Sequence, residues 1–379
     1  MKIMILGAGL VGKAMALDLA SDSEFKVTSV DINEERLVGL KKARISVLKR
    51  DLSRPRLIKE LVKGQDLIIN ALPGYLGFQT LRACLEAGRN VVDIAFFPED
   101  PFELDSLAKK KQVTAIVDCG VAPGLSNMLA SFGLNKLDKG KSLLIYVGGL
   151  PLVRQWPFEY KAVFSPRDVI EEYLRPARFK ENGELVVRPA LSDPEFLEFE
   201  NLGTLEAFNT DGLRTLLKTL DLPEMKEKTL RYPGHREKMM ILREAGFFDS
   251  EPVEISGHKI RPADFSAKIL FSRLNLAPGE ADLTVLRVVV NGEKNGRSVK
   301  LTYDLLDRFD QKTGIHSMAR TTGYTATVVS RALASGLITR KGIIAPEFLG
   351  SEPEVFKFIQ QGLRRKGIFI KEKIDYSSR

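Results

Sequence analysis

The segment Thr229–Lys238, TLRYPGHREK, places an arginine, a tyrosine and a histidine beside a Pro-Gly turn. The guanidinium of Arg231 can bind a carboxylate through two parallel hydrogen bonds. His235, one of three histidines in the chain, can accept a proton near neutral pH. A structural salt bridge and a satisfied turn histidine are the alternatives. The segment predicts a substrate-binding arginine and a general base, whereas Tyr232 is expected to pack in the core.

A second group of residues can bind a dinucleotide. The GxGxxG motif Gly7-Ala8-Gly9-Leu10-Val11-Gly12 follows an apolar run and opens an amphipathic segment. Glycines allow a tight turn there, and backbone amides at a helix N-terminus can approach a pyrophosphate. Asp31 ends the next apolar run, where a carboxylate accepts ribose hydroxyls and repels a 2′-phosphate. The pattern predicts NAD as cofactor, although Arg36 could hold a phosphate; a glycine turn without cofactor is the alternative.

Several residues follow the later apolar runs, where an open parallel sheet binds its ligand. The residues predicted to line the cofactor crevice are Asp51, Ala71, Leu72, Pro73, Asp93, Asp118, Gly120 and Val121. Ordinary strand-end turns are the alternative for each of them, and Asp93 and Asp118 could cap the helices that follow. Cys119 has no evident base nearby and is expected to be a packed thiol.

The elements that must position these residues alternate along the first part of the chain. Short runs rich in Val and Ile alternate with amphipathic segments up to about residue 135, as in KIMILG, KVTSVDI and DLIINAL. This rhythm predicts an α/β fold with a Rossmann, doubly wound parallel sheet. Residues 283–307 predict two long antiparallel strands around an Asn-Gly turn. We expect residues 1–130 plus 318–379 to form the NAD domain, and 131–317 an inserted α+β domain for substrate binding and dimerisation.

Composition excludes several classes of protein. The 379 residues carry a net charge of +8, but basic and acidic residues are interspersed, so no nucleic-acid partner is predicted. No apolar run is long enough to span a membrane. Two cysteines fit a reducing, cytoplasmic compartment. Lys/Glu pairs and few glutamines would suit a thermophile. No residue is predicted as a metal ligand.

A resemblance to a known family runs in order along nearly the whole chain. Its strings are the N-terminal glycine loop, NALP, ACLEAG, VVD, DCGVAPGLSN, IYVGGLP and TLRYPGH. Together they resemble the saccharopine dehydrogenase family, and DxGVAPG followed by YVGGxP is similar to its L-lysine 6-dehydrogenase branch. The resemblance implies NAD-dependent oxidation of the lysine ε-amine to an aldehyde that cyclises, with NADH and ammonia as the other products. It also implies lysine catabolism, a homodimer, and Arg231 as the ligand of the substrate carboxylate.

Three positions differ from motifs of the family. Saccharopine reductases have GLDPG where this chain has Ala122, and SYCGGLP where it has Val147. Some lysine 6-dehydrogenases have Gly-Gly-His where this chain has Ala95-Phe96-Phe97. The first two differences weaken the saccharopine reading, and the third leaves the exact amine open.

The segment Phe158-Glu159-Tyr160 supplies two more candidate substrate ligands. Saccharopine reductases tend to have glycine at the position of Glu159, whose added carboxylate could hold an ammonium group, and Tyr160 could donate a hydrogen bond. A solvated glutamate is the alternative. A saccharopine or carboxynorspermidine-type dehydrogenase, acting on a larger secondary amine, stays open as the enzymatic alternative. An NAD-sensing binding protein is the non-enzymatic one.

Overall fold

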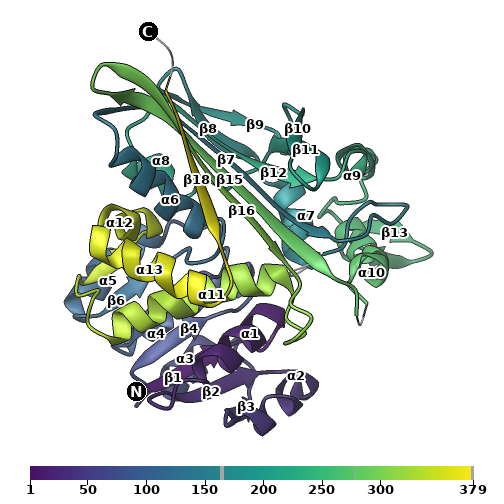
Figure 1. Cartoon of the computed structure of the whole chain (residues 1–379). Helices are drawn as coiled ribbons and strands as arrows, with labels where there is room; N and C mark the ends of the chain where they lie inside the picture. The colour runs from purple at the N-terminus through teal and green to yellow at the C-terminus, as the bar shows by residue number, and fades with distance from the viewer. Residues whose placement is uncertain (163–165, 278, 377–379) are drawn as a thin grey trace. The chain divides into compact units, whose positions relative to one another are not determined.

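The structure is a computed structural model that describes residues 1–162, 166–277 and 279–376. The chain forms two compact units (Figure 1). Unit 1 comprises residues 1–135 and 318–369, and unit 2 comprises residues 136–317 and 370–379. Among the described residues, no helix is long and apolar enough to cross a membrane.

Unit 1 is built on a seven-stranded parallel sheet in the order β17-β6-β5-β4-β1-β2-β3. The order reverses between β1 and β4, which is the doubly wound arrangement. The predicted fold class is therefore confirmed. The strands are β1 Lys2–Leu6, β2 Lys26–Asp31, β3 Ser46–Lys49, β4 Leu67–Asn70, β5 Asn90–Asp93, β6 Thr114–Ile116 and β17 Gly342–Ile344.

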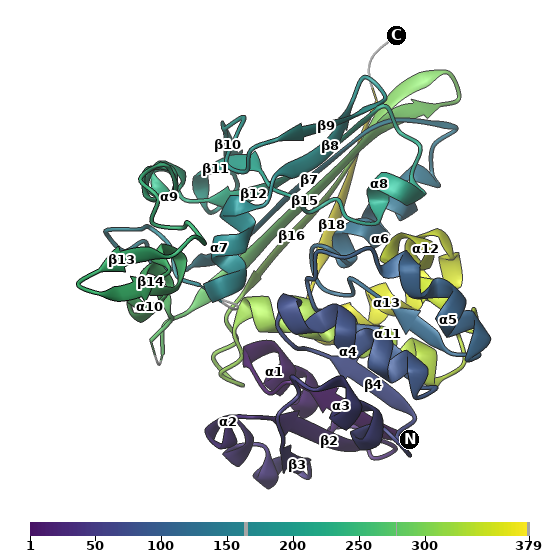
Figure 2. The same ribbon diagram turned by 180° about the vertical axis from the view of Figure 1, so that it is seen from behind.

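Helices lie on both faces of this sheet, as Figures 1 and 2 show together. Their bounds are α1 Leu10–Leu19, α2 Glu34–Val38, α3 Pro55–Leu61, α4 Gly74–Glu86, α5 Asp105–Lys110, α6 Leu125–Leu134, α11 Ser317–Ala334, α12 Pro346–Ser351 and α13 Pro353–Arg365, with 3-10 turns η1 Lys41–Ala43 and η2 Pro101–Leu104. Apart from the edge strand β3, which has no buried residue, the sheet strands are mostly buried because both faces are covered.

Helix α11 is held against α1 by a buried carboxylate. Asp18 accepts hydrogen bonds from Thr327 Oγ1 at 2.6 Å and Arg331 Nη1 at 2.7 Å, and it also pairs with Lys366. Burial alone would raise its pKa, but Arg331 and Lys366 lower it below the ordinary value. Helix α11, although it comes late in the sequence, is therefore part of the same unit as the N-terminal strands.

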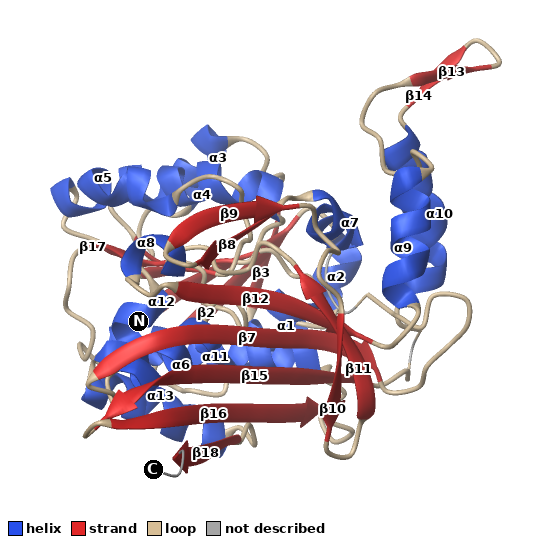
Figure 3. Ribbon diagram, turned by 90° about the horizontal axis from the view of Figure 1, so that it is seen from above, coloured by secondary structure: helices blue, strands red, loops and turns tan. Residues whose placement is uncertain are grey.

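Unit 2 is built on a nine-stranded mixed sheet. Its main path is β10-β11-β12-β7-β15-β16-β18, with β8 pairing β12 and β9 pairing β8. Figure 3 shows the long strands side by side. The strands are β7 Lys139–Pro151, β8 Ala177–Glu181, β9 Glu184–Arg188, β10 Glu195–Phe199, β11 Gly203–Asn209, β12 Glu224–Arg231, β15 Asp282–Lys294, β16 Arg297–Arg308 and β18 Ile370–Tyr376.

The helices of unit 2 are α7 Pro166–Leu174, α8 Leu216–Thr219, α9 His235–Glu244 and α10 Pro262–Leu274. A small hairpin, β13 Val253–Ile255 and β14 His258–Ile260, connects α9 to α10 and extends away from the main sheet (Figure 3). Side chains from α7, α9 and α10 pack with Tyr160 and Phe208 in one apolar cluster. The predicted long hairpin is present, with β15 and β16 joined at Asn295-Gly296.

The C-terminal strand β18 belongs to unit 2, which differs from the expected domain division. Residues 318–379 were all expected in the nucleotide-binding domain, but β18 forms seven antiparallel residue pairs with β16 of unit 2. The strand covers an edge that would otherwise present unpaired backbone groups. The first junction also falls at residues 135–136 rather than 130–131, because α6 continues to Leu134.

Candidate functional site

The glycine loop of unit 1 joins β1 to α1 and has the geometry of a dinucleotide-binding turn. Gly7 adopts φ +105°, and a Cβ there would lie 2.6 Å from the carbonyl oxygen of Ala71. A Cβ on Gly12 would overlap the carbonyl oxygen of Gly7. A Cβ on Gly9, in contrast, would meet no atom within 4 Å. The first and third glycines are therefore required by close packing, whereas Gly9 leaves open space.

Asp31 lies at the end of β2, directly beside this loop. Its Oδ2 accepts a hydrogen bond from the Ala8 amide at 2.7 Å, and its Oδ1 accepts one from the Asn33 amide at 2.8 Å. Each carboxylate oxygen can accept a second hydrogen bond. Arg36 Nη1 is 3.7 Å from Oδ2, and the Arg36 side chain is 56% exposed. The carboxylate is thus fixed in orientation, with an exposed cation at its outer side.

Ala71 and Leu72, which follow β4, lie next to the glycine loop. The Ala71 amide donates to the Leu6 carbonyl at 2.9 Å, and Leu72 is within reach of a Cβ built on Gly7. Pro73 is the N-cap of α4. Asp51 lies farther along the sheet edge, after β3, where Oδ1 accepts from the Ser53 amide at 2.9 Å. That backbone hydrogen bond lowers the pKa of Asp51.

Asp93 is the last residue of β5, and Asp118 follows β6. Both are buried. Asp93 accepts from the Asn70 side chain at 2.8 Å and from the Ala95 amide at 2.7 Å. Both carboxylate oxygens of Asp93 therefore support the loops around them. Gly120 donates its amide to the Pro123 carbonyl at 3.0 Å, within a tight turn that contains Val121.

The residues of unit 1 fit a nicotinamide dinucleotide. The amides of Leu10, Val11 and Gly12 open α1 and have no acceptor within the helix. The space in front of Gly9 allows a phosphate to approach them. The fixed Asp31 carboxylate would then receive the adenosine ribose. The apolar Phe97 packs against Phe78 with ring centroids 5.6 Å apart, so it fills space beneath α4.

Arg231, at the end of β12 in unit 2, is almost completely buried. Its Nη2 donates to Glu172 Oε2 at 2.9 Å, its Nε to the Tyr173 hydroxyl at 3.1 Å, and its Nη1 to the Leu230 carbonyl at 2.9 Å. Its guanidinium carbon lies 4.4 Å from the ring centroid of Tyr160. Burial alone would lower its pKa, but the Tyr160, Tyr173 and Glu172 side chains raise it.

His235 begins α9 and is also fully buried. Nδ1 lies 2.7 Å from the Phe158 carbonyl oxygen, and Nε2 lies 2.8 Å from the Tyr173 hydroxyl. A carbonyl oxygen only accepts, so Nδ1 carries the proton and Nε2 accepts from Tyr173. Burial and the nearby Arg231 charge lower the pKa of His235 to about 3. The imidazole is therefore neutral at pH 7.

The structure brings Tyr160, Arg231 and His235 together. The Tyr160 ring lies 4.8 Å from the His235 ring, and its buried hydroxyl has no hydrogen-bond partner among the described residues. Burial raises the pKa of Tyr160 to about 12. The Glu159 carboxylate instead pairs with Arg154 at 3.4 Å and Lys238 at 3.7 Å. Tyr232 lies apart and donates its hydroxyl to the Pro151 carbonyl at 3.0 Å.

Glu172, Tyr173 and Glu227 also belong to this cluster, but we did not predict them from the sequence. Glu172 and Tyr173 lie on α7, where no motif marks them. Glu227 lies on β12, four residues before Arg231 and on the same face of the strand, and this period-two spacing is the signal that could have identified it. Burial raises the pKa of Glu227 to about 8. Thr210 and Thr229 connect Glu227 to Glu172.

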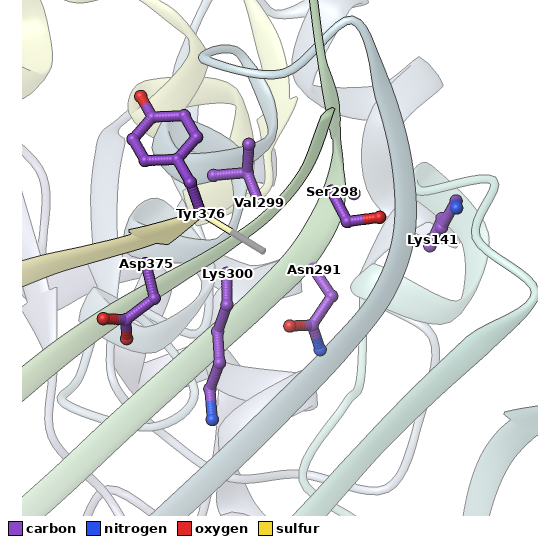
Figure 4. A pocket seen from close by; sticks show the side chains of 8 residues that line it. Lys141, Asn291, Ser298, Val299, Lys300, Asp375 and Tyr376 are labelled. Carbon is purple, nitrogen blue, oxygen red and sulfur yellow. The ribbon is translucent and has the colours of Figure 1, made fainter. Parts of the chain in front are cut away.

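A separate groove lies in unit 2 where β7 and β16 begin and β15 and β18 end (Figure 4). It contains none of the predicted site residues, and its lining is Lys141, Asn291, Gly292, Ser298, Val299, Lys300, Asp375 and Tyr376. In the described ranges, no group of three or more His, Cys, Asp or Glu side chains could hold a metal ion.

Comparison with known proteins gives two family matches. Residues 3–116 match the saccharopine dehydrogenase NADP binding domain, and residues 120–368 match the saccharopine dehydrogenase C-terminal domain. The mitochondrial alpha-aminoadipic semialdehyde synthase of Mus musculus is 24% identical over 97% of this chain and 47% of its own length. The chain thus spans about half the length of that relative.

Two further similarities extend over full chains. The carboxyaminopropylagmatine dehydrogenase of a Synechocystis strain is 23% identical over 96% of both chains. The apo structure of L-Glu-forming saccharopine dehydrogenase from Saccharomyces cerevisiae has 21% identity, a TM-score of 0.80 and 99% coverage of each chain. That structural likeness shows a common fold. The two domain matches, which together cover most of the sequence, show that the chain belongs to the saccharopine dehydrogenase family.

Proposed function

We propose that the protein is an L-lysine 6-dehydrogenase. It would oxidise the ε-amine of lysine with NAD and yield NADH, ammonia and an aldehyde that cyclises to piperideine-6-carboxylate. The observation that carries the proposal is the buried ion pair between Arg231 and Glu172, 2.9 Å apart. One cation beside one carboxylate is complementary to the carboxylate and ammonium groups of a free amino acid.

The choice of NAD rests on Asp31. Its carboxylate lies beside the glycine loop, where it can accept the ribose hydroxyls and would repel a 2′-phosphate. The matched domain is named for NADP, and Arg36 could offset that repulsion. The bound nicotinamide ring would supply the hydride acceptor.

The residues of unit 2 would bind and orient the substrate. Arg231 would hold the substrate carboxylate, and Tyr160 has a free hydroxyl that can donate one hydrogen bond. The ε-amine must be neutral, because its lone pair drives the transfer of hydride from Cε to the cofactor, so a base is needed. His235 is our candidate for this base. The proton would go to Nε2, which the Tyr173 hydroxyl contacts. Its low pKa means that it would hold the proton only briefly. Glu159 stays a candidate ligand for an ammonium group.

A dehydrogenase of larger secondary amines is the second candidate, supported by the names of the relatives. Saccharopine carries three carboxylates, whereas the hydrogen-bonded cluster around Arg231 contains one cation and two carboxyl groups. A single cation, already paired with Glu172, suits a substrate with one carboxylate, such as lysine, better than one with three.

The test is NAD or NADP reduction with a panel of amines. Lysine, ornithine, saccharopine and carboxynorspermidine are compared, and ammonia is assayed in parallel. Lysine should give NADH and ammonia in equal amounts. Reduction only with saccharopine, without ammonia, would select the second candidate. Binding of NAD with no turnover of any amine would indicate a sensor protein.

We also propose a cytoplasmic homodimer that needs no metal, membrane or nucleic acid. Sedimentation velocity of the full chain, with NAD present and absent, tests the dimer.

A further inference from the structure

Three side chains of β12 point to the same face of the unit 2 sheet. Glu227, Thr229 and Arg231 are spaced by two residues, so they project on one side of the strand. The Thr210 hydroxyl lies 2.7 Å from Glu227 Oε2 and 2.9 Å from the Thr229 hydroxyl. The Thr229 hydroxyl in turn contacts Glu172 Oε1. Two carboxyl groups are thus connected through two threonine hydroxyls in the protein interior.

The number of hydrogen atoms in this chain determines its protonation. The three oxygen-to-oxygen contacts are Glu227–Thr210, Thr210–Thr229 and Thr229–Glu172. The two hydroxyls supply two hydrogens, and ionised carboxylates supply none. Three contacts need three hydrogens, so one carboxyl group must be protonated. Glu172 is paired with Arg231, which places the extra proton on Glu227.

The charges around Glu227 agree with that assignment. The group is buried on β12 and faces Glu172 of α7 and Asp211 of the loop after β11, both of which disfavour a further negative charge. Asp211 is held by Arg178 through two contacts of 2.9 and 2.8 Å. Arg175, at the end of α7, also interacts electrostatically with Asp211. The amide of Gly212 donates to Glu227 Oε2 at 3.0 Å, which partly offsets the burial.

Glu172 is the member of this chain that a ligand can reach. Its side chain is 20% exposed, whereas Glu227, at the other end of the chain of contacts, is buried. We propose that Glu172 and Glu227 share one proton in the ligand-free protein, that Glu172 recognises a primary ammonium group of the substrate, and that the proton on Glu227 is released when the ammonium binds. The identity of the ligand rests on the proposed function; the shared proton does not.

The charge balance explains the release. In the free protein, ionised Glu172, protonated Glu227 and the Arg231 cation sum to zero. Lysine adds one positive charge, and loss of one proton from Glu227 to solvent returns the sum to zero. An opposite charge nearby lowers a carboxyl pKa by roughly 1–3 units. Glu227 would therefore act through Thr210 and Thr229 as a positioning residue for the ligand carboxylate Glu172.

Infrared difference spectroscopy of the full-length, ligand-free protein tests the shared proton. Wild type at pH 7 should show the C=O band of a buried carboxylic acid. Glu227→Gln, a neutral isostere of the protonated side chain, should lose this band. Glu224→Gln changes the same residue type on the same strand, outside the chain of contacts, and should keep it. An unchanged band in Glu227→Gln would overturn the proposal.

Calorimetry of L-lysine binding, in two buffers of different ionisation enthalpy and without cofactor, tests the release. Wild type should release up to about one proton per lysine at pH 7, and Glu227→Gln almost none. Thr229→Val should weaken the release, and Thr229→Ser should restore it. Nα-acetyl-lysine and Nε-acetyl-lysine identify the ammonium group, since the responsible one loses its effect when acetylated.

Two outcomes would separate failure of the shared-proton proposal from failure of the proposed function. Proton release with no NADH formed from lysine supports the carboxyl pair and rejects the dehydrogenase assignment. NADH formed from lysine, with equal proton release in wild type and Glu227→Gln, supports the assignment and overturns the carboxyl pair.

Discussion

Arg231 of β12 and Glu172 of α7 form an ion pair in which the arginine is buried and the glutamate is the outer partner. The arginine donates to three acceptors at once, and its guanidinium lies over the ring of Tyr160. The pair therefore joins a helix to the central sheet of unit 2 and leaves one carboxylate at the accessible end.

Replacing Glu172 by Gln should destabilise unit 2, because it leaves the Arg231 charge buried without a counter-ion. Breaking a buried pair costs about 3–5 kcal/mol, and the partial exposure of Glu172 reduces this to roughly 2–3 kcal/mol. Denaturant unfolding measures the loss. Glu171→Gln, at the neighbouring exposed position, is the matched control and should unfold like wild type. An equal loss in both variants would mean that the pair is not what stabilises α7.

The stability of the protein should fall between pH 6.5 and 8. The folded-state pKa of Glu227 is raised from 4.5 to about 8, so its contribution is full below 4.5 and lost as the pH rises to 8. His235 has the opposite effect on how stability changes with pH, because its folded-state pKa is lowered from 6.5 to about 3. Its penalty is largest at low pH and fades as the pH rises through 6.5. Between pH 6.5 and 8 the loss from Glu227, about 1.5 kcal/mol in total, is the larger effect.

Thermal unfolding followed by circular dichroism at pH 6.5, 7.25 and 8 checks this dependence. Glu227→Gln should flatten it, and Glu224→Gln should leave the wild-type slope. A steep slope in Glu227→Gln would assign the proton to another group.

Asp31→Ala should weaken NAD binding by roughly 10- to 100-fold, since charged hydrogen bonds contribute about 1.5–3 kcal/mol. NADP binding should change less, because the lost carboxylate also repelled the 2′-phosphate. Arg36→Ala is the companion variant. Its exposed pair at 3.7 Å contributes little, so NAD affinity should hold while NADP affinity drops. Fluorescence titration with both cofactors measures the ratio. Equal losses for NAD and NADP in Asp31→Ala would reject the ribose contact.

Gly9→Ala and Gly12→Ala should separate binding from folding. A methyl group at Gly9 meets no atom of the protein and the backbone there is compatible with alanine, so stability should stay within about 0.5 kcal/mol of wild type. Cofactor affinity should fall sharply, because the methyl group occupies the approach of the phosphate. Gly12→Ala collides with the Gly7 carbonyl and should destabilise unit 1. Full NAD affinity in Gly9→Ala would show that the dinucleotide binds elsewhere.

His235→Asn should lower kcat for lysine and shift its pH profile if the histidine is the base. An asparagine amide can still donate to the Phe158 carbonyl, as Nδ1 does now, so the start of α9 should persist. Circular dichroism verifies the fold. A kcat and a pH profile identical to those of wild type would remove His235 from the mechanism and leave it as a buried structural group.

The sequence predicted unit 1 better than unit 2. Val- and Ile-rich runs alternating with helices allow few topologies, and the glycine spacing identifies the loop after β1 without any tertiary information. The Arg231 cluster was predicted only in part. Tyr160, Arg231 and His235 lie in recognisable segments, but Glu172 and Tyr173 come from an ordinary amphipathic helix. Their role depends on how α7 packs against β12, which local sequence does not encode. The pairing of β18 with β16 is likewise a long-range contact without a local signal.

The pairing of β18 with β16 has a consequence for how the protein is made. Each compact unit takes segments from both sides of the other, so no single uninterrupted fragment contains either of them. During translation, β16 is synthesised well before residues 370–376. Its edge therefore stays unpaired until those residues have left the ribosome. An open edge invites pairing with other nascent chains. We therefore expect the order of synthesis, and the chaperones present during it, to influence the yield of this protein more than its final stability does.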